Sequence, residues 1–219
     1  MRIVSLSHVL SELTPGYGGS VGFEQIIASQ ISEGASSNSK KWTLSNHIGT
    51  HIDFPLHFDD EGKSLSDFEA SDWVFQTPFL LEYAAEAEEL IPPSVFESVP
   101  IDADFVILKT GFEAQRGNKE YWNNNPGLSP ESGDWIRQNR PNLKVLGFDF
   151  ISITSYQHRM VGREAHRRFL SPKFDGGPLR VVEDMKLAEL HQSPKQLVVS
   201  PLLVKDADGS PVTVFAFLK

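Results

Sequence analysis

Hydrophobic and polar residues alternate most regularly between residues 47 and 58. One set of alternate positions reads Ile, Thr, Ile, Phe, Leu and Phe, and the other reads His47, Gly49, His51, Asp53, Pro55 and His57. Successive side chains of an extended chain point to opposite faces. The pattern therefore predicts an extended segment with one apolar face and one face that carries three imidazoles and a carboxylate. A helix would break the alternation and would contain both the glycine and the proline.

The same reading predicts the other elements of the chain. Strands are expected where short apolar runs or alternating stretches occur, over residues 2–6, 23–31, 78–84, 105–108, 143–149, 179–183, 196–205 and 211–218. Helices are expected over 92–99, from the N-cap Ser129 and its following proline onward, and over 163–170, with a helical turn at 185–190. Residues 59–64 read as a solvated acidic loop and 117–127 as a long irregular loop. No repeat or linker interrupts the pattern, so a single domain over 1–219 is expected.

Composition narrows the class of protein. The 219 residues are 40% hydrophobic and include 15 Phe and 4 Trp, which is enough for one large core. The net charge of −9 and the lack of a basic block argue against nucleic-acid binding. No run approaches the roughly 20 apolar residues of a membrane span, and no signal-peptide pattern opens the chain, so we expect no membrane association and a cytoplasmic protein. Without cysteine there is no disulfide and no thiolate metal site.

The polar face of residues 47–58 is typical of a divalent-metal site. Imidazole nitrogen and carboxylate oxygen are both common ligands, and this donor set suits zinc, manganese or iron(II). In a straight strand His47 and His57 would lie roughly 33 Å apart, so the chain must bend, and Gly49 and Pro55 are the residues that permit it. The alternative is a half-buried strand that is simply rich in histidine.

Further ligands are expected from distant parts of the chain. His166 and Glu183 are the candidates, each weak by itself, and Asp149 and Asp184 are comparable competitors. The residues alone leave the choice between them open.

Residues 47–58 also resemble the signature of a known family. The segment His-x-Gly-Thr-His-x-Asp-x-Pro-x-His-Phe agrees at all eight fixed positions with the metal-dependent cyclase family, which includes bacterial kynurenine formamidase and isatin hydrolase. Residues 110–112, 125–129, 147–152, 166–170 and 183–187 resemble later segments of that family. The resemblance implies an α/β fold of the swivelling β/β/α type, in which a barrel-like core of mixed β-sheet is surrounded by helices.

The resemblance also implies roles for the residues of the site. His47, His51 and Asp53 would bind a first metal ion. His166 and Glu183 would complete a second position, with Asp53 and Glu183 bridging the two. One or two ions per chain are thus expected, with zinc as the first choice and manganese as the alternative.

Two more residues receive roles from the resemblance. His57 would be the general acid/base. Tyr17, in the Thr-Pro-x-aromatic loop of residues 14–17, would contact the substrate. The chain departs from kynurenine formamidase here, because Tyr17 replaces a Trp and Gly18 a Pro, and residues 171–178 form a longer insert between the late histidine and glutamate. These departures leave the identity of the substrate open.

The implied activity is hydrolysis of a small amide or N-formyl group by a metal-activated water, because a divalent metal lowers the pKa of bound water toward about 7. The alternatives are hydrolysis of a cyclic amide such as isatin or of a lactone, and a metal-dependent protein that binds a small ligand without catalysis. The implied partners are a small-molecule substrate and other copies of the chain, in a homodimer or a higher homo-oligomer.

Overall fold

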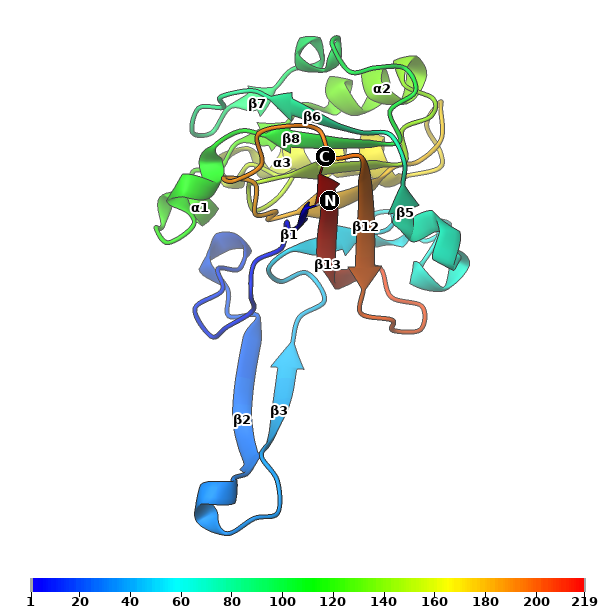
Figure 1. Cartoon of the computed structure of the whole chain (residues 1–219). Helices are drawn as coiled ribbons and strands as arrows, with labels where there is room; N and C mark the ends of the chain where they lie inside the picture. Colours follow the sequence, from blue (N-terminus) through cyan, green and yellow to red (C-terminus); the bar gives the residue numbers. More distant parts are fainter. Residues whose placement is uncertain (1, 219) are drawn as a thin grey trace.

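A mixed sheet of nine strands forms the centre of the chain in the computed structural model, which describes residues 2–218 (Figure 1). In sheet order the strands are β5 (Val74–Phe75), β12 (Gln196–Pro201), β13 (Gly209–Leu218), β4 (His51–Asp53), β11 (Arg180–Glu183), β10 (Val145–Phe148), β8 (Phe105–Lys109) and β6 (Pro78–Glu82). The ninth strand, β1 (Arg2–Ser5), pairs with β13.

The two ends of this sheet are joined by the chain itself. β5 lies at one end of the strand order and β6 at the other, yet only Gln76 and Thr77 separate them in sequence. The sheet must therefore curl until its edges approach each other. This confirms the expected α/β fold with a nearly closed, barrel-like mixed sheet.

Both faces of the sheet are covered, which explains the unbroken apolar run in β8. Phe105 and Ile107 point into one core with β4, β12 and β13, and Val106 and Leu108 point into a second core. The strand is thus buried on both sides, and a continuous apolar run is typical of that position. Antiparallel pairing links β12, β13, β4 and β11, whereas β11, β10, β8 and β6 pair in parallel.

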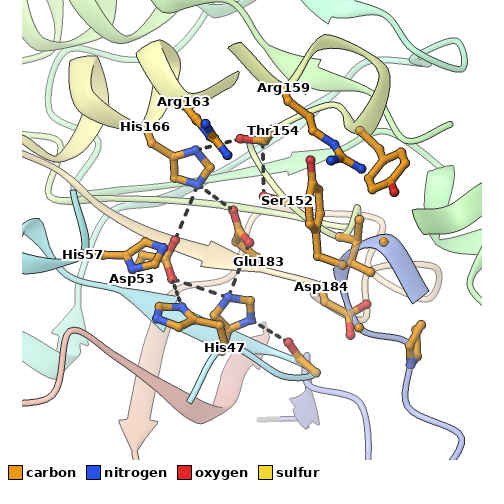
Figure 2. Close-up of a pocket in the computed structure, with 18 of the residues that line it drawn as sticks. His47, Asp53, His57, Ser152, Thr154, Arg159, Arg163, His166, Glu183 and Asp184 are labelled. Carbon is orange, nitrogen blue, oxygen red and sulfur yellow. Dashed lines mark hydrogen bonds and ion pairs between the residues drawn. The ribbon is translucent and has the colours of Figure 1, made fainter. Parts of the chain in front are cut away.

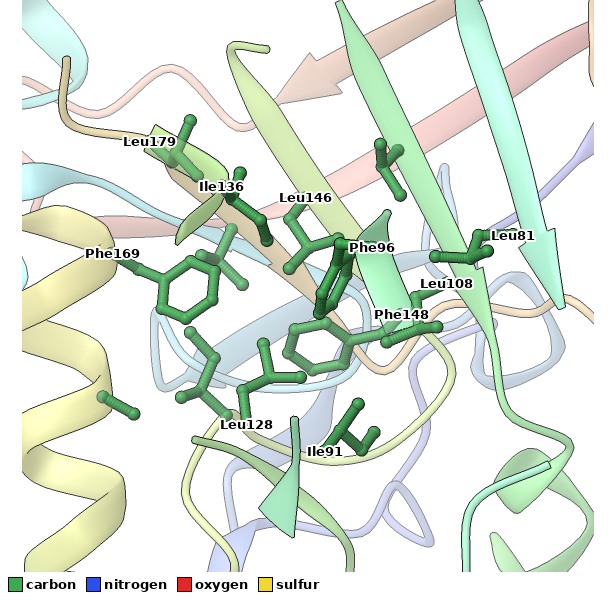
Figure 3. Packing of buried hydrophobic residues seen from close by; sticks show 14 of the residues in the cluster. Leu81, Ile91, Phe96, Leu108, Leu128, Ile136, Leu146, Phe148, Phe169 and Leu179 are labelled. Carbon is green, nitrogen blue, oxygen red and sulfur yellow. The ribbon is translucent and has the colours of Figure 1, made fainter. Parts of the chain in front are cut away.

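The second core lies between the sheet and two helices, α2 (Pro130–Asn139) and α3 (Arg159–Leu170). Figure 3 shows the α3 side of this core, with Phe169 pointing from the helix toward the sheet. Ile136 of α2 and Phe169 of α3 are buried in it. The predicted N-cap is confirmed, because the Ser129 hydroxyl accepts a hydrogen bond from the Ser132 amide at 3.3 Å. Among residues 2–218 no helix combines the length and the apolar character that crossing a membrane would require.

The remaining elements are short. They are the helix α1 (Glu120–Asn123), the parallel pair β7 (Leu90–Ile91) and β9 (Gly127–Leu128), and the 3-10 turns η1 (Tyr17–Gly19), η2 (Ile31–Glu33), η3 (Pro55–His57), η4 (Leu65–Asp67), η5 (Ala70–Trp73), η6 (Pro93–Phe96), η7 (Phe112–Gln115) and η8 (Tyr156–His158).

One hairpin stands apart from the rest of the molecule. Among residues 2–218, the strands β2 (Phe23–Ser29) and β3 (Ser39–Leu44) pair only with each other, and they project away from the central sheet (Figure 1). We call this hairpin the arm. Ile26 and Trp42 on it are 61% and 63% exposed, which is unusual for large apolar side chains.

Several predicted segments differ from the structure, among them the helix expected over 92–99, of which only the 3-10 turn η6 forms. Residues 185–190 contain a single hydrogen-bonded turn, in which the Leu190 amide donates to the Leu187 carbonyl at 2.9 Å, but no helix, because the Met185 and Lys186 amides donate to the carbonyls of Phe148 and Leu6. The expected irregular loop at 117–127 contains the one-turn helix α1, which buries Tyr121 completely.

A further difference lies in the acidic loop of residues 59–64. Asp59 is buried there, where it accepts hydrogen bonds from the Ser171 hydroxyl and from the Lys173 ammonium at 2.9 Å. These bonds fasten the insert of residues 171–178 to the loop, so Asp59 has a structural role and was wrongly predicted to be solvated.

Candidate metal centre and its pocket

Two neighbouring strands and one helix bring the polar groups together. His51 and Asp53 lie two residues apart on β4 and share one face of the sheet. β11 pairs antiparallel with β4 and places Glu183 opposite His51. His166 reaches the same point from α3 (Figure 2). The pairing register of two strands that are far apart in sequence therefore brings the central residues of the site together.

The predicted bend in residues 47–58 is confirmed. Only His51–Asp53 is a strand, Gly49 has a φ of 63°, and the turn η3 begins at Pro55. A Cβ on Gly49 would lie 2.5 Å from Cδ2 of Leu10, so the position also lacks room for a side chain.

The bend brings the two ends of the motif together. The rings of His47 and His57 stack with their centroids 4.0 Å apart. Phe58 was assigned to the apolar face, and this was wrong, because the turn rotates it toward the site, where it stacks on His166 at 4.4 Å.

Both carboxylates divide their oxygens between two histidines. Nε2 of His51 lies 3.4 Å from Oδ1 of Asp53 and 3.4 Å from Oε2 of Glu183. Nε2 of His166 lies 3.8 Å from Oδ2 of Asp53 and 3.7 Å from Oε1 of Glu183. Nδ1 of His47 lies 2.8 Å from Oδ1 of Asp53 and so joins the His51 side.

These separations fit a divalent cation. Ligands about 2.0–2.2 Å from a tetrahedral ion lie roughly 3.3–3.6 Å from one another, which is close to the distances on the His51 side. The four residues are each at most 5% exposed, and no lysine or arginine of residues 2–218 forms an ion pair with either carboxylate. Two buried carboxylates without a lysine or arginine partner are costly unless protonated imidazoles or a metal cation balance their charge.

Backbone carbonyls set the orientation of two imidazoles. Nδ1 of His51 donates to the carbonyl of Gly49 at 2.8 Å, and Nδ1 of His166 donates to the carbonyl of Gly162 at 2.9 Å. In both rings Nε2 is then the atom that faces the carboxylates. Such outer hydrogen bonds are the usual means by which proteins fix the tautomer of a metal-binding histidine.

The protonation equilibria of the site are strongly shifted. Burial disfavours the imidazolium of His51, but Asp53 and Glu183 outweigh it and raise its pKa well above the usual value. The pKa of His166 is raised in the same way against burial, mainly by Glu183. Burial would raise the pKa of Asp53, but His47 and His51 hold it well below its usual range. A divalent cation would compete with the protons on these imidazoles.

His57 differs from the other three imidazoles. Burial, together with the neighbouring imidazoles of His47 and His166, lowers the pKa of His57 by more than the carboxylates of Asp53 and Asp208 raise it. It therefore favours the neutral form, which can accept a proton.

One residue of the site had not been predicted. Asp208 follows β12 in the turn before β13, and its Oδ2 accepts hydrogen bonds from Nε2 of His47 at 3.0 Å and from Nδ1 of His57 at 2.9 Å. The pairing of β13 with β4 brings the turn there. In the sequence Asp208 belongs to an Asp-Ala-Asp-Gly turn, and no local pattern distinguishes it from other turn residues.

The two competing aspartates have other partners. Asp149 accepts hydrogen bonds from the amides of Thr110 and Gly111, both at 2.8 Å, and so joins the ends of β10 and β8. Asp184 forms a bidentate ion pair with Arg116 at 2.8 and 2.7 Å. Neither carboxylate shares its oxygens between His51 and His166, as Asp53 and Glu183 do.

All predicted site residues line one cavity of about 500 Å³. They are Tyr17, His47, His51, Asp53, His57, His166 and Glu183. Tyr17 is half-buried, its hydroxyl has no hydrogen-bond partner among residues 2–218, and its ring meets the edge of Tyr156 at 5.4 Å. The structure thus places the predicted residues together, whereas their individual roles stay predictions.

This geometry defines a class of proteins that have a barrel-like α/β fold and a buried histidine–carboxylate centre. Residues 4–155 match the family model described as putative cyclase, and the chain belongs to this family.

Several named proteins are similar over most of the chain. A kynurenine formamidase of Bacillus thuringiensis is 24% identical over 209 residues, covering 95% of this chain and 94% of the relative. One of Bacillus cereus is 26% identical over 210 residues, with the same coverage. Among solved structures, isatin hydrolase A of Labrenzia aggregata superposes with a TM-score of 0.77 at 21% identity, covering 99% of this chain and 93% of that chain. This structural likeness agrees with the fold.

Proposed function

We propose that this chain is a metal-dependent hydrolase that cleaves a small amide or N-formyl group. The observation that carries the proposal is the arrangement of Asp53 and Glu183, whose buried oxygens are divided between His51 and His166. The similarity to kynurenine formamidases over 95% of the chain supports an amide as the bond that is cleaved.

His47, His51 and Asp53 would hold one ion, and His166 with the second oxygens of Asp53 and Glu183 would hold another. We propose zinc first and manganese as the alternative, since nitrogen and oxygen donors accept both. A bound divalent cation supplies a Lewis acid that polarises a carbonyl and makes water more acidic.

His57 is the proposed proton carrier. Its Nδ1–H donates to Asp208 at 2.9 Å, so Nε2 is the atom left to accept a proton. The ring could take a proton from the attacking water and return it to the leaving nitrogen, a role that suits a neutral imidazole. Asp208 holds the ring in the tautomer that this transfer needs.

Tyr17 is the proposed substrate contact in the N-terminal loop. Its unpartnered hydroxyl lies in the same cavity as the donor set. A buried hydroxyl without a partner costs free energy, and a polar group of a bound substrate would supply that partner.

The test is a substrate panel on protein loaded with zinc or with manganese. The panel holds N-formylkynurenine, formanilide, isatin and a simple aryl lactone. We expect hydrolysis of at least one formamide, its loss after chelation and its return with metal. His57→Ala should retain the metal and lose about 10²- to 10⁴-fold in kcat.

The panel also separates the alternatives. Turnover of isatin or the lactone in place of the formamides would favour the cyclic substrates. Tight binding of panel compounds by metal-loaded protein without any hydrolysis would refute the enzyme and favour a ligand-binding protein.

A further inference from the structure

Helix α3 presents three cationic or titratable residues at helical spacing. Arg159, Arg163 and His166 stand at positions i, i+4 and i+7, so they lie on one face of the helix. All three line the cavity that contains the donor set. Figure 2 shows the two arginines on the same side of the cavity as His166, with His47 and His57 across from them. The helix that supplies a donor therefore also supplies two guanidinium groups to the cavity wall.

These two arginines have no carboxylate partner within residues 2–218, in contrast to their neighbours on α3. Arg167 pairs with Glu164 at 3.5 Å, and Arg168 pairs with Glu164 at 2.7 Å and with Asp134 at 3.1 Å. The guanidinium of Arg159 instead stacks over the ring of Tyr156 at 3.9 Å. In a chain with a net charge of −9, two exposed arginines that remain unpaired at a cavity are available to a bound anion.

An aromatic wall lies beside the arginines. Tyr156 contacts Arg159 on one side and the edge of Tyr17 on another. The loop that carries Tyr17 lies directly against Tyr156, since a Cβ on Gly18 would stand 2.8 Å from its Cε2. Burial raises the pKa of the Tyr17 phenol to about 12, and both arginine charges oppose that rise, so the three side chains share one electrostatic environment.

We propose that Arg159 and Arg163 form a carboxylate subsite, and that the substrate is an aromatic amide or formamide that carries a carboxylate. The amide end lies at the donor set, the ring lies against Tyr17 and Tyr156, and the carboxylate meets the guanidinium groups. Arginine suits this task because its planar fork binds a carboxylate with two parallel hydrogen bonds. This inference rests on the proposed function and narrows it to one class of substrate.

A matched pair of substrates tests the subsite on the metal-loaded protein. Formanilide and 2-formamidobenzoate share the scissile bond and the ring, and only the second carries a carboxylate. The wild-type protein should have the higher kcat/KM for 2-formamidobenzoate. In the double variant R159Q/R163Q the ratio of the two kcat/KM values should fall about 10- to 100-fold, mainly through KM, since one hydrogen bond to a charged group contributes roughly a tenfold effect or more.

Arg167→Gln is the control variant, because it removes an exposed arginine of the same helix that already has a partner. It should leave the ratio within twofold of the wild-type value. Raising the salt concentration should lower the wild-type ratio and should affect the double variant less, since exposed charges are screened.

Binding without turnover separates this inference from the proposed function. Calorimetry with anthranilate should show a dissociation constant that rises at least tenfold in R159Q/R163Q. Arginine-dependent binding of anthranilate without hydrolysis of either formamide would support the subsite and refute the hydrolase. Hydrolysis of both formamides with a ratio that is unchanged in the double variant would refute the subsite and leave the hydrolase standing.

Discussion

Replacing Asp208 by alanine is the sharpest test of how the site is organised. We assign this carboxylate no contact with the substrate, yet its Oδ2 accepts hydrogen bonds from Nε2 of His47 and Nδ1 of His57. The first bond orients the His47 ring so that its Nδ1 faces Asp53, and the second leaves Nε2 of His57 free to accept a proton. Asp208→Ala should therefore weaken metal binding through His47 and slow proton transfer through His57 at the same time.

The magnitude follows from the exposure of the side chain. A hydrogen bond to a charged group contributes roughly 1.5–3 kcal/mol when water is excluded, but the Asp208 side chain is 38% exposed. Taking the lower end for each bond gives about 3 kcal/mol in all, shared between the two imidazoles. Each function should then lose about 10-fold, within the range of about 10–100-fold that removal of such outer groups causes at metal sites.

The assay measures the two losses separately. Competition with a chromophoric chelator reports metal affinity, and kcat at saturating metal reports the proton transfer. Asp208→Asn should lose less than alanine, because an amide oxygen can still accept hydrogen bonds. Asp206→Asn is the control, since the exposed Asp206 side chain approaches Lys205 at 3.8 Å and asparagine tolerates the positive φ of 56° at this position of the same turn. If Asp208→Ala kept wild-type metal affinity and wild-type kcat, the assigned positioning role would be wrong.

Three further predictions concern other parts of the molecule. Gly209→Ala should weaken metal binding about tenfold in the chelator assay, because the new Cβ would stand 2.2 Å from Cε1 of His47, whereas Gly177→Ala, with nothing within 4 Å, should not. Burial lowers the pKa of His8 from 6.5 to about 4, so the unfolded chain binds this proton more tightly and the protein should lose stability as the pH falls from 6.5 to 4. His8→Gln should flatten the urea midpoint as a function of pH over this range, and an unchanged slope would show that His8 is not the group responsible. The expected homo-oligomer should use the exposed arm, so Trp42→Asp should lower the mass measured by light scattering, and a wild-type monomer would exclude this.

The part of the site that the sequence could predict is the part encoded locally. Residues 47–58 hold four site residues whose alternation and whose need for a bend can be read directly. Gly49 and Pro55 then adopt the positive φ and the turn that the bend requires. The barrel-like fold followed from resemblance, since the strand pattern alone was compatible with several mixed sheets.

The unpredicted part depends on strand register and on a weak helix start. Asp208 reaches the site only because Gly209 pairs with Asp53 across two strands that are distant in sequence. Helix α3 was expected to begin at residue 163 but begins at Arg159, and His158 before it provides no side-chain cap, so no residue marked the first turn. Arg159 was therefore not placed on the His166 face, and the pair of arginines in the cavity was missed.

The origin of the side chains suggests how substrate preference could change while the chemistry is kept. Apart from His47, which precedes β4, the donors stand on β4, β11 and the middle of α3, where paired strands and the second core hold them in place. Tyr17 and Tyr156 stand on short 3-10 turns, and Arg159 opens its helix. Replacements in such turns and at a helix end are better tolerated than replacements in the sheet, whereas a change of register at β4 would turn His51 and Asp53 away from Glu183. Relatives that share the donors should therefore differ first at residues equivalent to Tyr17, Arg159 and Arg163, and exchanging the arginines for neutral residues should move this chain toward uncharged amides without loss of the metal.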